Sequence, residues 1–236
     1  MPSNQVFSHV TAAVLLGLPL PLAVECDARV HVTALEGGRA PRRSGVAGYS
    51  TTGHPPVRQV RGLRVLAPAD AWCSLAGRLQ HDDLVAAGDR LVGLPSPLAS
   101  FDEIDRAIAR HGNRAGAANL RRARADLRAN SYSRPETLAR LALLRAGLPE
   151  AEPNGVIELR SGRRTRGDLV FRTYKVLVEY DGEHHRLDLG QWTTDVTRLN
   201  DLAADGWLVI RATKRMALAD LVTRAERALR DRGWTR

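Results

Sequence analysis

The segment VLVEYDGEHHR, residues 176–186, begins as an apolar strand and ends in a cluster of ionisable side chains. Val176, Leu177 and Val178 are residue types that favour a buried strand. The next seven residues hold three carboxylates and two imidazoles, namely Glu179, Asp181, Glu183, His184 and His185. Either the strand simply reaches the surface at this point, or it carries these groups to a functional site.

The preceding segment RGDLVFR, residues 166–172, also has the composition of a strand. A hairpin turn near residues 172–174 would pair the two strands, and Asp168 lies 11 residues before Glu179. Side chains alternate between the faces of a strand, so Glu179 and Asp181 project to the same side. The pairing would therefore place Asp168 beside Glu179 or Asp181.

Carboxylates that lie this close repel one another unless a divalent cation sits between them. Such hard oxygen ligands suit Mg²⁺ or Mn²⁺. Gly182 allows a turn that returns His184 or His185 towards the acids, and a histidine with a pKa near neutrality can accept the proton of an attacking water. No further histidine or cysteine follows at ligand spacing, which argues against a zinc site.

A purely structural interpretation of these acids stays open. Glu179 and Asp181 could be exposed at a strand end, and Asp168 could pair with one of three neighbouring arginines, Arg163, Arg164 or Arg166. Each acid taken singly fits this interpretation better. The acids and histidines taken together favour a metal site.

The composition of the 236 residues is that of a globular protein with one or two domains. A net charge of +9 suggests a polyanionic partner such as DNA, although 33 of the 35 basic residues are arginine, which can also reflect GC-rich coding. Cys26 and Cys73 form no C-x-x-C pair. This argues against a disulfide scaffold and fits a reducing cytoplasm, which is the expected location.

The apolar segment at residues 11–24 is too short to cross a bilayer, and no lysine or arginine precedes it as in a signal peptide. Pro19 and Pro21 would end a helix there. We therefore expect a core helix and no membrane partner.

Residues 1–130 predict a small α+β region. Helices are expected at 8–19, from Pro68, at 81–92, at 101–112 and at 113–130, and strands at 28–35, 46–51 and 59–66. Ser100 and Glu103 have the spacing of a capping box. The helix at 113–130 carries Arg121 and Arg122, which would either follow a phosphate backbone or form a solvated face.

Residues 131–236 predict one compact α/β domain. A second capping-box pattern at Ser133 and Glu136 opens a helix. Then follow strands at 154–160, 166–172 and 174–182, a helix at 192–206, a strand at 207–213 and a helix from about 217 to 232. Trp207 is expected in the core, beside an apolar run typical of a strand buried on both faces.

Residues 133–215 resemble the PD-(D/E)XK, or restriction-endonuclease-like, nucleases, and in particular the Vsr-like endonuclease branch. The matching segments are PETLARLALLRAGL, GDLVF, VLVEYDGEHHR and DVTRLNDLAADGWLVIR, in that order. The resemblance implies a mixed sheet flanked by helices, with an active site at one sheet edge. It also implies an endonuclease that uses Mg²⁺ or Mn²⁺ to hydrolyse DNA phosphodiester bonds, in DNA repair or defence.

The resemblance implies that Glu136, Asp168 and Glu179 are the family's acidic positions, with Asp168 and Glu179 holding the metal. Asp181 stands where many relatives carry lysine. The Vsr-like branch uses histidine instead, so His185 or His184 is the candidate base. Arg198 and Asp195 match a further D-x-x-R element, in which Arg198 either contacts phosphate or pairs with Asp195. The arginines expected to bind DNA are Arg166, Arg186, Arg198, Arg121 and Arg122.

Residues 8–130 resemble, more weakly, a region of proteins related to AbiEi-type antitoxins, without the winged helix-turn-helix that usually precedes it. The expected fold class is thus α/β, with a restriction-endonuclease-like mixed sheet at residues 131–236 preceded by a smaller α+β region at 1–130. The alternative function is a catalytically inactive, DNA-binding regulator or antitoxin-like protein. The sequence leaves the oligomeric state and the type of DNA substrate open.

Overall fold

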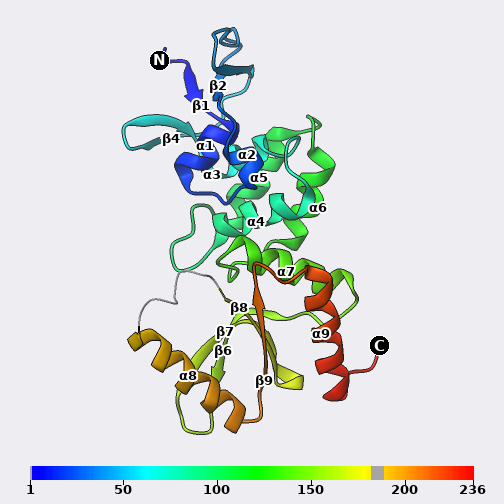
Figure 1. Cartoon of the computed structure of the whole chain (residues 1–236). Helices are drawn as coiled ribbons and strands as arrows, with labels where there is room; N and C mark the ends of the chain where they lie inside the picture. Colours follow the sequence, from blue (N-terminus) through cyan, green and yellow to red (C-terminus); the bar gives the residue numbers. More distant parts are fainter. Residues whose placement is uncertain (1, 182–188) are drawn as a thin grey trace. The chain divides into compact units, whose positions relative to one another are not determined.

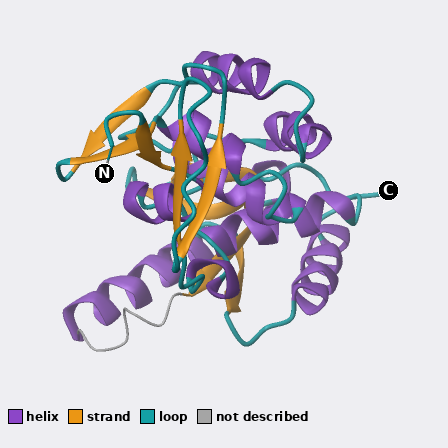
Figure 2. Cartoon of the chain, turned by 90° about the horizontal axis from the view of Figure 1, so that it is seen from above, coloured by secondary structure: helices purple, strands orange, loops and turns teal. Residues whose placement is uncertain are grey.

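The computed structural model describes residues 2–181 and 189–236, with side chains described for residues 2–180 and 196–236. The chain forms two compact units, Met1–Ala129 and Asn130–Arg236 (Figure 1). Each unit contains one mixed β-sheet with helices packed against it. Figure 2 shows the strands in orange and the helices around them in purple. The expected α/β fold class is therefore confirmed. No helix in the described part of the chain is long and apolar enough to cross a membrane.

The N-terminal unit is built on a five-stranded sheet with the order β3-β2-β1-β5-β4. Its strands are β1 (Gln5–Phe7), β2 (Val30–Ala34), β3 (Val46–Ser50), β4 (Val57–Val60) and β5 (Leu63–Leu66). Strand β1 is antiparallel to β2 and parallel to β5, while β2 is parallel to β3. The strand expected at 59–66 is instead an antiparallel hairpin. Its turn is made by Arg61 and Gly62, both with positive φ.

Six helices are described in this unit: α1 (His9–Leu16), α2 (Leu22–Glu25), α3 (Pro68–Ser74), α4 (His81–Val92), α5 (Phe101–His111) and α6 (Ala117–Asp126). The capping box of α5 is confirmed, since Ser100 Oγ accepts the Glu103 N–H and the Glu103 carboxylate accepts the Ser100 N–H. Helix α6 is shorter than expected at both ends: it starts after Gly116, at φ 84°, and it ends before Leu127, which is extended. A Cβ at Gly116 would lie 2.3 Å from the carbonyl carbon of Ala76, so only glycine fits.

The C-terminal unit contains a four-stranded sheet with the order β6-β7-β8-β9. Strands β6 (Glu152–Glu158), β7 (Arg164–Phe171) and β8 (Val176–Asp181) pair in antiparallel fashion. The expected hairpin turn between β7 and β8 is a short 3₁₀ segment, Arg172–Tyr174, followed by Lys175 in the left-handed conformation. Strand β9 (Leu208–Thr213) is parallel to β8 and follows helix α8 (Leu189–Ala204).

Helices cover both faces of this sheet (Figure 1). Helices α7 (Arg134–Arg145) and α9 (Leu218–Asp231) pack on one face, where Leu169, Phe171, Val176 and Val178 join one apolar cluster. Val170, Leu177, Leu202 of α8 and Trp207 form the cluster on the other face. Neighbouring residues of β7 and β8 thus alternate between the two clusters, as the strand geometry requires.

Trp207 is 7% exposed, so its expected burial is confirmed. The expectation of a strand buried on both faces is only partly met. Strand β9 lies at the edge of the described sheet, and Leu208 and Val209 are half-buried while Arg211 is exposed. An edge strand lacks a neighbour on one side, which leaves part of its apolar run accessible.

Candidate functional site

The paired acids lie where the β7–β8 hairpin stops pairing. The register joins Leu169 to Val178 and ends there, and the same register continued by one residue sets Asp168 opposite Glu179. Beyond this point a side-chain hydrogen bond takes the place of the backbone hydrogen bonds between the strands: Asp168 Oδ2 accepts the Tyr180 N–H at 2.6 Å. The two carboxylates are also close enough to interact, because the negative charge of Glu179 contributes to the raised pKa of Asp168.

Asp168 is a carboxylic acid with an unusual pKa. Burial raises its pKa from 3.8 to about 7, and repulsion by Glu179 and, less strongly, by Glu136 adds to this rise. The Tyr180 N–H and the Arg198 guanidinium act in the opposite direction without offsetting it. Asp168 is therefore partly protonated near neutral pH, and the site would be stabilised by additional positive charge.

Glu179 is held by Arg198 of α8. The Arg198 guanidinium forms an ion pair with Glu179 Oε1, and it also donates to the Arg166 carbonyl oxygen and, at 2.7 Å, to Thr165 Oγ1. Both side chains of the ion pair are largely buried, at 20% and 18% exposure. Arg198 thus joins α8 to β7 and β8, a role beyond the two alternatives expected from the sequence. The side chain of Asp195 lies outside the described residues.

Glu136, in the first turn of α7, is buried at 9% exposure. Its carboxylate accepts from Tyr132 N–H at 3.1 Å, Ser133 Oγ at 2.7 Å and Asn154 Nδ2 at 2.8 Å. These contacts fix Glu136 at the helix start, and its charge acts on Asp168 from there. The Ser133 side chain accepts the Glu136 N–H, so the N-cap half of the expected capping box is confirmed. The Glu136 carboxylate accepts the Tyr132 N–H and the Ser133 hydroxyl, where a capping box would use the Ser133 N–H.

Asn154 of β6 is a site residue that the sequence analysis missed. Its Nδ2 also donates to the Asn130 carbonyl oxygen at 2.7 Å, and its φ of 47° is left-handed. Asparagine is among the few residue types that adopt this conformation readily. The only signal in the sequence is the pair Asn154-Gly155, which is typical of a turn rather than of a strand interior.

Two of the three arginines offered as structural partners for Asp168 contact other groups. Arg163 pairs with Asp201 at 2.7 Å, and Arg166 donates to the Tyr132 hydroxyl at 3.2 Å. Neither of these contacts involves Asp168. The raised pKa of Asp168 accordingly reflects burial beside two other acids rather than a structural ion pair.

The donor set fits a hard divalent cation in part. Asp168 and Glu179 supply two carboxylates at one point of the sheet, and oxygen ligands of this kind suit Mg²⁺ or Mn²⁺, which usually keep several waters. No group of three metal-ligating side chains is found among the described residues. Asp181 belongs to β8 and pairs with Thr213, but its side chain lies outside the description, as do His184, His185 and Arg186 entirely.

Arg121 and Arg122 are placed on helix α6 of the N-terminal unit. Both are exposed, while Ala117, Leu120 and Ala123 form the buried face of the helix. Their exposure suits either of the roles considered from the sequence.

Comparison with known proteins adds no family assignment. No family model, curated protein or solved structure matches this chain.

Proposed function

We propose that the chain is a metal-dependent endonuclease that hydrolyses DNA phosphodiester bonds, with the reaction centre in the C-terminal unit. The observation that carries this proposal is the position of Asp168, whose pKa is raised to about 7, opposite Glu179 just beyond the last paired residues of β7 and β8. Two coupled acids at such a point are a strong candidate for a functional site.

Asp168 and Glu179 would hold one Mg²⁺ or Mn²⁺. When bound, such a cation polarises the scissile phosphate and lowers the pKa of a coordinated water. The chain positions its own ligands, because the Tyr180 N–H orients Asp168 and Arg198 orients Glu179. His185 or His184 would accept the proton of the attacking water.

The net charge of +9 supports DNA as the partner. In this proposal Arg166, Arg186 and Arg198 contact the phosphate backbone near the centre, and Arg121 and Arg122 add contacts from the N-terminal unit. Binding of this kind neutralises phosphates and releases counterions, so the affinity should fall steeply with salt. The proposed location is the cytoplasm.

The decisive experiment incubates supercoiled plasmid and labelled single strands with the purified chain and Mg²⁺ or Mn²⁺. Asp168→Ala should abolish cleavage while preserving or improving DNA binding, because it removes a negative charge and leaves the arginines in place. Asp231→Ala is the matched control, since Asp231 is exposed at the end of α9. Cleavage that survives in Asp168→Ala would come from a contaminating nuclease and would remove the support for this proposal.

A catalytically inactive, DNA-binding regulator is the second candidate function. The Glu179–Arg198 ion pair favours it, because Arg198 supplies positive charge to the acids without any cation. The same assay separates the two functions. Salt-sensitive DNA binding by the wild type, with no cleavage in either metal, would favour the regulator over the endonuclease.

A further inference from the structure

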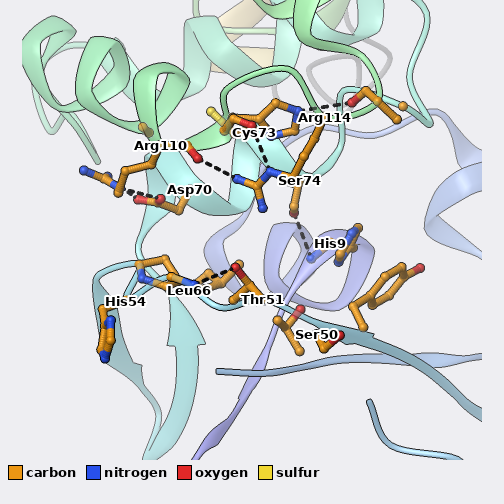
Figure 3. Close-up of a pocket in the computed structure, with 18 of the residues that line it drawn as sticks. His9, Ser50, Thr51, His54, Leu66, Asp70, Cys73, Ser74, Arg110 and Arg114 are labelled. Carbon is orange, nitrogen blue, oxygen red and sulfur yellow. Dashed lines mark hydrogen bonds and ion pairs between the residues drawn. The ribbon is translucent and has the colours of Figure 1, made fainter. Parts of the chain in front are cut away.

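The N-terminal unit contains a cavity of about 740 Å³ (Figure 3). It is lined by residues of α1, β2, β3 and β5, by the loop after β3, and by helices α3 and α5 with the loop that follows each of them. Its volume lies within the range of roughly 300–1,000 Å³ that is typical of small-molecule sites. All of its lining residues belong to the N-terminal unit, whereas Asp168 and Glu179 belong to the C-terminal unit.

The ionic side chains that line this cavity carry an excess of positive charge. Arg78, Arg110 and Arg114 contribute three cations, and Asp70 is the one carboxylate in the described lining. Arg78 also lies 3.9 Å from Asp27, a carboxylate outside the lining that pairs more closely with Arg29, at 2.9 Å. Asp70 accepts from Arg110 at 3.0 and 2.7 Å, and the two side chains face each other in Figure 3. Arg114 donates to the carbonyl oxygens of His111 and Arg110, which orient the guanidinium without neutralising it. The lining therefore favours an anionic ligand.

A chain of hydrogen bonds orients Arg78 from behind the cavity wall. Asp27 Oδ2 lies 3.1 Å from Nε2 of the fully buried His31, and His31 Nδ1 lies 3.1 Å from the Tyr49 hydroxyl. Burial lowers the pKa of His31, so its ring is neutral. The proton then belongs on Nε2, facing Asp27, and Nδ1 accepts from Tyr49. The Tyr49 oxygen in turn accepts from Arg78 at 2.6 Å. The partners thus fix both the Tyr49 ring and the Arg78 guanidinium.

An aromatic pair forms part of the same wall. The rings of His9 and Tyr49 stack at 3.7 Å between centroids with an angle of 18°. His9 has a φ of 47°, and its backbone N–H donates to Ser74 Oγ at 3.1 Å, a contact drawn in Figure 3. A left-handed histidine is uncommon, and such conformations gather at functional sites. Burial lowers the pKa of His9 to about 3, so the stacked ring is uncharged at neutral pH.

The arginine charges and the aromatic pair are close to each other. After burial and His31, the positive charges of Arg78 and Arg114 are the next causes that lower the pKa of His9. A ligand against the stacked rings would therefore feel both guanidinium groups. Apolar residues, among them Leu66, Cys73 and Ala107, line other parts of the cavity. The complementary ligand is a small molecule with a flat ring and a compact anionic group.

We propose that this cavity binds a nucleoside 5′-monophosphate, with the phosphate on Arg78 and Arg114 and the base against the His9–Tyr49 stack. Guanidinium groups match the oxygens of phosphate in a two-pronged geometry. Aromatic side chains stack on any base because every base has a flat π-face. Inorganic phosphate would use the arginines but leave most of the 740 Å³ unfilled.

The test is calorimetric titration of the full-length chain at low salt with AMP, GMP, CMP and UMP, each compared with its nucleoside and with inorganic phosphate. At least one nucleotide should bind with one-to-one stoichiometry and a Kd below about 1 mM. Its nucleoside and inorganic phosphate should each bind at least roughly tenfold more weakly. Absence of binding by all four nucleotides, or equal binding by the nucleoside, would overturn the proposal.

Matched variants connect the binding to the cavity. Arg78→Gln and Arg114→Gln should each weaken the nucleotide by roughly tenfold or more, because each removes a charged phosphate partner. Arg106→Gln makes the same charge change on α5 at an exposed residue outside the lining, and should stay within about twofold. Tyr49→Phe keeps the stacking ring but breaks the contact with Arg78, and should weaken binding. If Arg106→Gln weakened binding as much as Arg78→Gln and Arg114→Gln, the nucleotide would be bound by non-specific electrostatic attraction and not by the cavity.

Hydrogen exchange of the wild-type chain tests the location of the bound nucleotide without depending on whether the variants fold. Bound nucleotide should slow exchange in β3, in α3 and in residues 111–115, which line the cavity. Protection confined to β7 and β8 would place the nucleotide at the acids of the C-terminal unit, and the proposal would fail.

Discussion

Replacing Asp168 with asparagine should stabilise the metal-free protein at alkaline pH. The pKa of Asp168 is about 7 in the folded chain, against 3.8 for the ordinary carboxyl group. As the pH rises from about 4 to 7, the unfolded chain has already released this proton while the folded chain still holds it. Wild-type stability therefore falls with rising pH across this window, and the full deficit is present above pH 7. Asparagine cannot ionise, so the variant does not undergo this loss of stability.

The magnitude follows from the same shift. A rise of roughly three units corresponds to about 4 kcal/mol, at about 1.4 kcal/mol per unit. The part that develops between about pH 5 and pH 8.5 amounts to about 3 kcal/mol. Asparagine retains a carbonyl oxygen that can accept the Tyr180 N–H, so the hydrogen bond at the end of the β7–β8 pairing is kept.

The assay is urea unfolding of the wild type, Asp168→Asn and Asp231→Asn in the presence of a chelator, near pH 5 and pH 8.5. The advantage of Asp168→Asn should grow with pH, and Asp231→Asn should follow the wild type because its side chain is exposed. Excess Mg²⁺ or Mn²⁺ should then stabilise the wild type more than Asp168→Asn. A pH-independent difference, or an equal gain in Asp231→Asn, would refute the account of this carboxyl group.

Four further outcomes are expected. His185→Ala should slow cleavage by roughly 10²–10⁴-fold and remove the limb of the pH–rate profile near neutral pH. His184→Ala should have a smaller effect. An unchanged pH–rate profile in His185→Ala would exclude His185 as the base. Arg198→Lys should lower the free energy of unfolding by roughly 2 kcal/mol in urea titrations, because one ammonium cannot make all the contacts of the guanidinium. The folded pKa of His9 is about 3 against 6.5 for a free ring, so the unfolded chain takes up the proton first as the pH falls. Stability should thus be lost between about pH 6.5 and 3, by up to about 5 kcal/mol. Thermal melts of His9→Asn should show a flatter dependence of stability on pH in this acid range. Asn154→Ala should lower the free energy of unfolding in urea by roughly 2 kcal/mol, because it removes the side-chain hydrogen bonds and places alanine in a left-handed conformation. An unchanged free energy of unfolding would show that Asn154 does not hold Glu136 in place.

Elements with strong local signals were predictable. Helix α4 occupies residues 81–92 as expected, and the capping box placed the start of α5 correctly. Strand β1 was missed because three residues are too few to show an alternating pattern, although it pairs with two neighbours at the centre of its sheet. The turn at Arg61-Gly62 was missed because one apolar pattern runs through both β4 and β5.

The features of the candidate site also fall into two groups, those that the local sequence predicts and those that depend on how distant elements pack. The proximity of Asp168 and Glu179 follows from hairpin pairing, which is a short-range property of the sequence. The contact of Arg198 with Glu179 depends on how α8 packs against the sheet, and no spacing along the chain encodes that packing. The cavity of the N-terminal unit was not foreseen at all, since its lining comes from segments between residues 9 and 115 that only the fold brings together.

Arg198 would compete with the proposed cation for Glu179, because its guanidinium already pairs with this carboxylate. A divalent ion that neutralises Glu179 would weaken the hold of the carboxylate on the guanidinium, while Thr165 and the Arg166 carbonyl oxygen would keep Arg198 in place. The arginine would then be anchored but electrostatically unsatisfied, at the moment when the cation arrives. Loading of the ion would thereby create an anchoring point for a phosphate, and the order of binding would be ion first and nucleic acid second.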